Sequence, residues 1–285
     1  MDISGKTRVC GVIGDPIEHS LSPIIHNAAF RSLKLDFAYL TFKVSPAQVG
    51  NAVAGMRSLG IVGLNVTMPH KEAVISHLDH IDENAKFLNA VNTIHNRDGK
   101  LFGYNTDGVG ALMALKENRA NPKGKRVLLL GCGGAARAIA YTLSKEIDEL
   151  MILNRTVSEA KELASLLKKN LGKKVNAEEL SEDKIKAKIA DSDILINATS
   201  VGMKPNANQS LVNAEWLKPN LTVMDIVYNP IETKLAKDAK SAGAKAVSGL
   251  EMLIYQGAAS FEIWTKKQAP VKVMREAALD YLSKV

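Results

Sequence analysis

The sequence predicts an α/β fold with two domains, and three observations lead to this prediction. The chain has 285 residues, a length that suits about two domains. In its first third, short apolar runs alternate with helix signals, a pattern typical of an open α/β sheet. Residues 127–137 then pass from an apolar run into a glycine turn that opens a helix, as in a Rossmann-like dinucleotide-binding domain.

The first domain is expected to span residues 1–108 as an open α/β substrate domain. Its strands are predicted from apolar runs, and its helices from prolines that suit the first helical position. The expected strands are 9–13, 37–42 and 63–66, and the expected helices begin near Pro23, Pro46 and Pro69. A second dinucleotide turn is not found among these segments, so this domain is left to bind the substrate.

The second domain is expected to span residues 109–249. A helix over about 108–118 and a polar turn over 119–125 lead into the glycine-turn strand, and three further apolar runs are typical of buried parallel strands: 150–153, 193–199 and 222–227. Residues 250–285 are predicted to form two helices, 250–266 and 271–284. Because their apolar faces need a partner, we expect them to pack back onto the first domain.

The composition limits the classes of function. With 46% hydrophobic and 24% charged residues, the chain is typical of a soluble globular protein. A net charge of +7 favours an anionic partner, but only 5% of the residues are aromatic, so a nucleic-acid surface with interleaved aromatic side chains is not expected. Small phosphorylated or carboxylate ligands fit this charge better.

The compartment is predicted from what the sequence lacks. The first residues contain no apolar targeting segment, and no run of about 18 apolar residues occurs, so neither secretion nor membrane insertion is expected. Cys10 and Cys132 are the only cysteines, and they give neither a disulfide framework nor zinc spacing. A reducing cytoplasm is the simplest location.

The glycine turn is the strongest single motif. Gly131, Gly133 and Gly134 let the backbone approach a pyrophosphate, and the helix that opens at Ala135 points free N–H groups and a positive dipole at the charge. The spacing departs from the usual G-x-G-x-x-G. A turn that only ties a strand to a helix is the alternative interpretation.

The end of the next strand decides which dinucleotide is expected. About 20 residues after the turn, an NAD site normally offers an acidic residue to the ribose 2′-hydroxyl. Here the strand ends in Asn154, Arg155 and Thr156, which supply a cation and neutral polar groups suited to a 2′-phosphate. The second domain is therefore predicted to bind NADP.

Four polar clusters upstream are candidates for the substrate site. In the first, Ser22 with Pro23 can simply start a helix, but Ser20 is not needed for that cap, and two hydroxyls at a positive helix end suit a carboxylate. The second cluster runs from Asn65 through Thr67 to Lys71. The third and fourth place amides or a carboxylate where strands meet loops: 89–93 and 103–108.

Lys71 and Asp107 are the candidates for proton transfer. If a helix begins at Pro69, Lys71 lies in its first turn, where a cation is disfavoured, so it is either a surface accident or kept to polarise a substrate oxygen. Asp107 can be the N-cap of the next helix, or it can hold the lysine ammonium. His77 and His80 could share a helix face, but their ligand set is incomplete, so a solvated helix rather than a metal site is predicted.

These segments resemble the shikimate dehydrogenase family over nearly the whole chain. The family's substrate-binding signature appears in order and with its spacing, as Ser20-Leu-Ser22-Pro, Asn65-Val-Thr67-Met-Pro-His-Lys71, Asn89-Ala-Val-Asn92-Thr and Asn105-Thr-Asp107-Gly. The second domain carries the family's markers Gly131-Cys-Gly-Gly-Ala-Ala, Asn154-Arg-Thr156, Asn197-Ala-Thr-Ser-Val-Gly202, Asp225-Ile-Val-Tyr228-Asn-Pro and Gly249 to Gln256-Gly-Ala.

The resemblance implies a role for each of these residues. The implied reaction is the NADPH-dependent reduction of 3-dehydroshikimate to shikimate in aromatic amino-acid (chorismate) biosynthesis, with Lys71 and Asp107 as the catalytic pair. The residues implied to hold the substrate carboxylate are Ser20, Ser22 and Tyr228. Those implied to bind the ring hydroxyls are Thr67, Asn92, Asp107 and Gln256, and those implied to lie along the nicotinamide are Gly249 and Met252.

Two other functions stay open. Many NADP-using members of the family carry a second arginine where this chain has Glu159, which weakens the implied grip on the 2′-phosphate. An NAD-dependent quinate/shikimate dehydrogenase therefore stays open, although Asn154, Arg155 and Thr156 argue against it. A non-catalytic NADP-sensing protein is the second alternative, although such a protein has no need of both Lys71 and Asp107. The expected assembly is a monomer or a homodimer.

Overall fold

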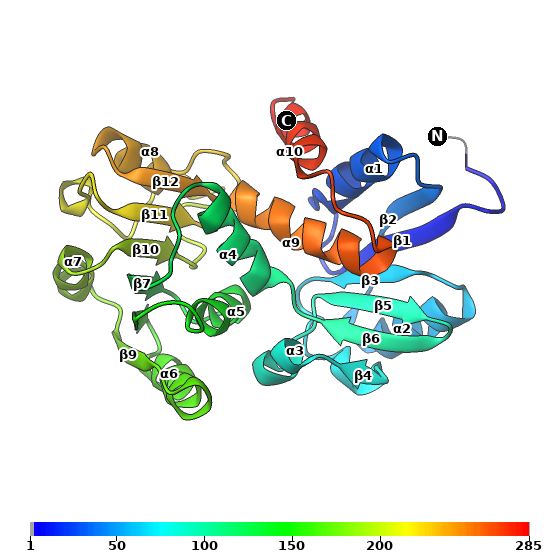
Figure 1. Ribbon diagram of the computed structural model, residues 1–285, viewed down its shortest axis with the longest axis horizontal. Helices are drawn as coiled ribbons and strands as arrows, with labels where there is room; N and C mark the ends of the chain where they lie inside the picture. The colour runs from blue at the N-terminus through cyan, green and yellow to red at the C-terminus, as the bar shows by residue number, and fades with distance from the viewer. Residues whose placement is uncertain (1–2, 285) are drawn as a thin grey trace. The chain divides into compact units, whose positions relative to one another are not determined.

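The computed structural model describes residues 3–284 and divides into two compact units. Unit 1 contains the chain up to Thr106 and again from Ile254, and unit 2 contains Asp107–Leu253. Both units combine a β-sheet with α-helices, so the predicted α/β fold class is confirmed (Figure 1). The units divide at residues 106 and 253, where the sequence predicted 108 and 249.

Unit 1 is built on a mixed six-stranded sheet. Its strand order is β2-β1-β3-β5-β6-β4. The strands are β1 (Arg8–Gly14), β2 (Phe37–Lys43), β3 (Gly63–Val66), β4 (His80–Ile81), β5 (Thr93–Arg97) and β6 (Lys100–Tyr104). β1 pairs in parallel with β2 and β3, whereas β5 runs antiparallel to β3 and β6. The three predicted strands of this unit are therefore confirmed.

The helices of unit 1 come from both ends of the chain. They are α1 (Ser22–Ser32), α2 (Val49–Ser58), α3 (Glu83–Leu88), most of α9 (Gly249–Thr265) and α10 (Val271–Leu282), with short 3₁₀ turns at η1 (Pro46–Gln48) and η2 (Ile75–His77). α10 packs on α1, and Trp264 of α9 donates from Nε1 to the carbonyl of Ile94 at 3.0 Å. The prediction that the final helices return to the first domain is confirmed.

The helix predicted from Pro69 does not form. Residues 71–74 are a turn, and only η2 follows. The reason is visible in the backbone hydrogen bonds, because the carbonyl of Lys71 accepts from the N–H of Val91 at 2.8 Å instead of from a helical partner. The helix predicted around His77 and His80 is wrong for a related reason, since His77 ends η2 and His80 begins β4.

The β5–β6 hairpin was not predicted. Its turn is Asp98-Gly99, and both residues have positive φ, +52° and +83°. Two such residues match the twist of a two-residue hairpin, for which Asp-Gly is a strong sequence signal. The dipeptide was therefore the evidence in the sequence that could have revealed this hairpin.

Unit 2 has a six-stranded sheet that is parallel throughout, in the order β12-β11-β10-β7-β8-β9 (Figure 1). The strands are β7 (Arg126–Leu130), β8 (Glu149–Asn154), β9 (Lys174–Glu179), β10 (Ile194–Asn197), β11 (Thr222–Asp225) and β12 (Lys245–Ser248). This is the strand order of doubly wound dinucleotide-binding folds, in which the order reverses at the first strand, here β7. The predicted buried parallel strands are confirmed.

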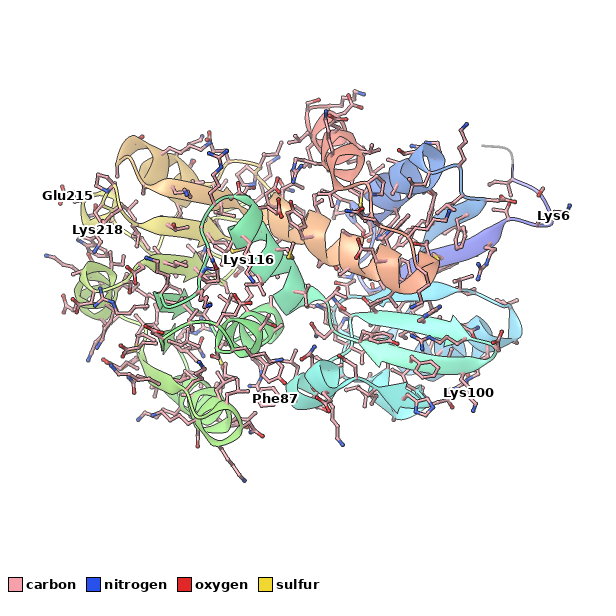
Figure 2. All side chains as sticks on the ribbon, in the orientation of Figure 1. Lys6, Phe87, Lys100, Lys116, Glu215 and Lys218 are labelled. Atoms are coloured by element: carbon pink, nitrogen blue, oxygen red, sulfur yellow. The ribbon has the colours of Figure 1, made fainter. Side chains whose placement is uncertain are left out.

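Helices follow the strands of unit 2 in alternation. They are α4 (Asp107–Glu117), α5 (Gly134–Leu143), α6 (Val157–Leu171), α7 (Glu182–Ala190) and α8 (Lys234–Ser241), with η3 (Ala214–Trp216) before β11. α4 packs on α5 so closely that a Cβ on Gly108 would collide with Thr142. Lys116, labelled on α4 in Figure 2, pairs with Glu146 at 2.7 Å. Among residues 3–284, no helix is long and apolar enough to cross a membrane.

Candidate functional site

The glycine turn of unit 2 lies at the carboxyl end of β7. Gly131 has a φ of +102°, and a Cβ there would lie 2.9 Å from the carbonyl oxygen of Ala198, so the backbone itself requires glycine. Gly133 and Gly134 have no atom within 4 Å of the Cβ position. Their open side is the space that a pyrophosphate needs to approach the backbone.

The helix that follows this turn is suited to an anion. Gly133 is the N-cap of α5, no side chain caps the helix, and its first turn contains no acidic residue. The N–H groups that begin at Gly134 and Ala135 are therefore not satisfied by a capping side chain, and the helix dipole adds positive potential. The residues predicted for the pyrophosphate thus have the geometry that this group requires.

The predicted ribose-reading residues stand beside the turn. β7 and β8 are neighbouring parallel strands, and the N–H of Gly131 donates to the carbonyl of Leu153 at 2.8 Å. Arg155 is exposed, and no ion-pair partner is found for it among residues 3–284. Glu159 instead accepts from Asn154 Nδ2 at 2.9 Å, so its carboxylate is held by the asparagine and leaves the guanidinium available.

A buried carboxylate fixes the loop after β11. Asp225 accepts from Asn197 Nδ2 at 2.9 Å, from Thr233 Oγ1 at 2.6 Å and from the N–H of Val227 at 3.1 Å. Burial raises the pKa of Asp225, and these hydrogen bonds oppose the rise. The loop that they hold carries Tyr228, whose pKa is also raised by burial.

Gly249 has a packing reason of its own. It begins α9 against the carbonyls of Ile226 and Val227, with which a Cβ would collide. Met252 follows on the same helix and is buried. A contact of either residue with the nicotinamide stays a prediction.

In unit 1, the loops after β1 and β3 meet. The N–H of Thr67 donates to Ile13 at 3.0 Å, and the N–H of Asp15 donates to Met68 at 3.1 Å. The bond from Val91 to the Lys71 carbonyl then places the Lys71 backbone next to the segment that carries Asn92. These bonds bring three predicted site residues to one edge of the sheet: Thr67, Lys71 and Asn92. The side chain of Lys71 is half-buried.

The serine cluster differs from its prediction. α1 begins at Ser22 itself, with Leu21 as the N-cap, so Ser22 is not the cap and Pro23 is at the second helical position. Ser20 Oγ accepts from the N–H of Ser22 at 3.3 Å, which makes Ser20 the hydroxyl that satisfies the helix start. Ser22 is buried.

A buried polar cluster joins several of these segments. The Tyr39 hydroxyl donates to Asn65 Oδ1 at 2.7 Å, and Asn65 Nδ2 donates to Ser260 Oγ at 3.0 Å. Ser260 also donates to the carbonyl of Gln256 at 3.1 Å. Tyr39 and Ser260 were not predicted. No local motif marks them, because the Asn65–Ser260 contact of this cluster joins residues that are 195 positions apart in the chain.

Asp107 opens unit 2 as the first residue of α4. The prediction that it is the N-cap, the residue before the helix, is therefore wrong. It is buried and follows Thr106, whose N–H donates to Asn92 Oδ1 at 2.9 Å. The pairing of Asp107 with Lys71 stays a prediction. Within the described residues, no group of three or more histidine, cysteine or acidic side chains could hold a metal ion.

Together these features define a class of protein. Unit 2 has the strand order, the open glycine turn and the exposed arginine of a domain that binds a nicotinamide dinucleotide. Unit 1 gathers hydroxyl, amide and ammonium groups at one edge of its sheet, as a polar small molecule requires. The class is an oxidoreductase with one unit for the cofactor and another for the substrate.

Comparison with known proteins narrows this class. Family models match residues 12–94 (shikimate dehydrogenase substrate binding domain), 113–241 (shikimate / quinate 5-dehydrogenase) and 249–279 (shikimate 5′-dehydrogenase C-terminal domain). A curated relative from Methanopyrus kandleri, named shikimate dehydrogenase (NADP(+)), is 49% identical over 99% of this chain and 98% of its own length.

Solved structures agree with this match. A crystal structure of shikimate dehydrogenase in complex with NADP+ has a TM-score of 0.92 at 45% identity, covering 99% of this chain and 98% of its own. Shikimate 5-dehydrogenase from Listeria monocytogenes, in complex with shikimate and NAD, has a TM-score of 0.92 at 38% identity, covering 97% and 98%. The chain belongs to the shikimate dehydrogenase family.

Proposed function

We propose that the protein is an NADP-dependent dehydrogenase that interconverts 3-dehydroshikimate and shikimate in aromatic amino-acid biosynthesis. One observation carries the proposal: an open glycine turn with an unpaired arginine beside it occurs in a chain 49% identical to a relative named shikimate dehydrogenase (NADP(+)). The polar edge of unit 1 supplies groups for a substrate that has one carboxylate and several hydroxyls.

The cofactor is assigned to unit 2. Gly131, Gly133, Gly134 and Ala135 would hold the pyrophosphate, while Asn154, Arg155 and Thr156 would hold the ribose and its 2′-phosphate. Arg155 suits this phosphate because a guanidinium pairs with phosphate oxygens through charge-assisted hydrogen bonds. Gly249 and Met252 would lie along the nicotinamide.

Lys71 is assigned the proton chemistry. When bound, NADPH supplies the hydride that reduces the ring ketone. The carbonyl oxygen then becomes a negative alkoxide and needs a proton. The Lys71 ammonium can both stabilise this negative oxygen and deliver the proton. In the reverse direction, the neutral amine takes the proton back, and the Asp107 carboxylate would hold the ammonium and exchange protons with it.

The substrate is assigned to the predicted polar residues. Ser20, Ser22 and Tyr228 would hold the carboxylate, because hydroxyls donate hydrogen bonds to it. Thr67, Asn92, Asp107 and Gln256 would bind the ring hydroxyls. Ser20 is the stronger carboxylate donor of the two serines, since Ser20 is half-buried whereas Ser22 is buried.

The setting of the enzyme is part of the proposal. Cys10 and Cys132 are both buried free thiols, which suits a reducing cytoplasm. The assembly is proposed as a monomer or a homodimer, and light scattering coupled to size-exclusion chromatography distinguishes the two.

The direct test is a steady-state assay of four reactions: shikimate or quinate, each with NADP or NAD. We expect the largest kcat/KM for shikimate with NADP. A larger value for quinate with NAD would instead support the NAD-dependent quinate/shikimate alternative, for which Glu159 is the only sequence evidence. Absence of turnover with tight NADP binding would support a sensing protein.

Cofactor choice is tested by two variants. Charge-assisted hydrogen bonds contribute about 1.5–3 kcal/mol, so Arg155→Ala should weaken NADP by roughly ten- to a hundredfold and hardly affect NAD. Glu159→Gln keeps an acceptor for Asn154 and removes one negative charge, so it should widen the preference for NADP. Equal losses for the two cofactors in Arg155→Ala would show that this residue does not read the 2′-phosphate.

A further inference from the structure

Thr93 is a buried hydroxyl that none of the roles above uses. It begins β5 directly after Asn92, and its side chain is 0% exposed. Its Oγ1 lies 2.9 Å from Asn92 Oδ1, 3.2 Å from Asn65 Nδ2 and 2.8 Å from Ser260 Oγ. A hydroxyl has one hydrogen to donate, so Thr93 can donate to only one of these three neighbours.

The orientation of Asn65 decides that distribution. Its Oδ1 accepts from the Tyr39 hydroxyl at 2.7 Å, so its amide nitrogen must face Thr93 and Ser260. Asn65 Nδ2 also lies 3.2 Å from the Asn92 carbonyl oxygen, so its two hydrogens are shared among three acceptors. Because this nitrogen is a donor, the Thr93 proton remains for either Asn92 Oδ1 or Ser260 Oγ. Ser260 has its own proton on the Gln256 carbonyl and is thus a competing acceptor.

The orientation of Asn92 follows from the same bonds. Its Oδ1 accepts from the Thr93 hydroxyl and from the Thr106 N–H, both at 2.9 Å. Its Nδ2 lies 3.0 Å from Thr106 Oγ1. The Thr106 hydroxyl lies 3.2 Å from the same oxygen. The oxygen therefore faces only donors of the protein, and the nitrogen is the donating end of the amide.

We propose that Thr93 is a positioning residue for this reaction, whose hydroxyl holds the Asn92 amide with its nitrogen towards the substrate. This inference rests on the proposed function, because it takes Asn92 as a substrate-binding residue. It adds a statement about recognition: Asn92 donates, so the substrate oxygen there accepts. A hydroxyl and a carbonyl oxygen both accept, so Asn92 can keep this contact in either oxidation state of the substrate.

The first test compares Thr93→Val with Thr93→Ser. Valine has nearly the shape of threonine but no hydroxyl, so Asn92 Oδ1 loses one donor and the amide can turn. A neutral hydrogen bond of ordinary strength corresponds to a roughly two- to tenfold rise in the KM for shikimate, with an unchanged KM for NADP. Thr93→Ser restores the hydroxyl and should restore the KM. A normal KM in a less stable Thr93→Val would overturn the proposal.

Ser260→Ala is the matched control. Ser260 is equally buried and shares the same cluster, so its loss also removes hydrogen bonds and lowers stability. It removes the competing acceptor for the Thr93 proton, however, so the KM for shikimate should stay the same or fall. An increase in the KM for shikimate would mean that the cluster acts only through general stability, and this outcome can be measured even if Thr93→Val does not fold.

Asn92→Ala separates this inference from the proposed function. It should raise the KM for shikimate at least as much as Thr93→Val does. If Asn92→Ala leaves the KM unchanged while shikimate is still turned over, the placement of Asn92 in the substrate site is wrong, and the role of Thr93 is overturned with it. If no shikimate is turned over by the parent enzyme, the proposed function fails first.

Discussion

Lys71 carries the proton step of the proposed reaction, and its main chain is held to Val91 rather than to a helix. Its position therefore depends on the segment that leads into β5 and not on a helix dipole. An oxyanion-stabilising group is typically worth about 2.7–4 kcal/mol of barrier. Lys71→Ala should lower kcat at least about a hundredfold and leave the KM for shikimate within a few-fold, because it removes an interaction made mainly in the transition state.

The control for this prediction is Lys86→Ala, which removes an exposed lysine from the last turn of α3. Its kcat should match the parent. Steady-state rates in the direction of shikimate oxidation measure both variants. A near-normal kcat in Lys71→Ala would remove this residue from the chemical step.

His26 gives a prediction about acid stability. Its ring is fully buried and stacks on Tyr39 with centroids 4.5 Å apart, and neither ring nitrogen has a hydrogen-bond partner among the described residues. Burial lowers the pKa of His26 from 6.5 to about 3. Between these values the unfolded chain binds a proton that the folded protein excludes, so the free energy of unfolding falls as the pH drops from 6.5 towards 3.

Urea unfolding at pH 7, 5 and 4 tests this slope. His26→Phe removes the titrating group and keeps an aromatic ring in the cluster, so its stability should depend less on pH. His95, whose pKa is lowered to about 4 mainly by burial, contributes with the same sign, and His95→Gln measures its share. A slope identical to that of the parent in His26→Phe would contradict the prediction.

The glycine turn shows that neighbouring glycines are required for different reasons. Any residue other than glycine would be strained at position 131. Gly131→Ala should therefore reduce the free energy of unfolding by more than about 1 kcal/mol. Gly133 has an ordinary φ of −70° and open space around it. Gly133→Ala should therefore keep its stability within about 0.5 kcal/mol and lose affinity for NADP, because its Cβ occupies the approach of the pyrophosphate.

Urea titration and fluorescence titration with NADP measure these two effects separately. Unchanged NADP affinity in Gly133→Ala would mean that the pyrophosphate does not approach this turn. Loss of stability in both variants would mean that the open side is needed for packing.

Elements whose evidence is local were predictable. The strand-turn-helix unit at Val127–Arg137 combines an apolar run with glycines at fixed offsets, and β7 and α5 form there. The prediction of a helix from Pro69 was wrong because a proline at a helix start is also compatible with a turn. The hydrogen bond between the Lys71 carbonyl and the N–H of Val91, 20 residues further along the chain, favours the turn. The predicted N-cap, Ser22, was wrong by one position, because Leu21 is the N-cap of α1.

At the scale of the whole molecule, each unit has its own hydrophobic core. One core gathers buried residues that include Ile13, Leu64 and Leu101, and the other gathers residues that include Leu128 and Leu195. The apolar faces of the last two helices were enough to predict that the chain returns to unit 1. The polar cluster of unit 1 was not predictable, because Asn65 and Ser260 meet only after that return.

The division of labour between the units gives the last prediction. A ligand that binds only the folded state stabilises it by about 2.7 kcal/mol at 100 times its dissociation constant. If the cofactor belongs to unit 2 and the substrate mainly to unit 1, NADP should slow hydrogen exchange most at residues 131–137 and 154–157. Shikimate should slow it most at the loops after β1 and β3 and around Asn92. Hydrogen exchange followed by mass spectrometry, with each ligand alone, resolves these segments.

Arg155→Ala is the control, because it should weaken the protection by NADP and leave the protection by shikimate intact. Protection by NADP confined to unit 1 would overturn the assignment of the two units.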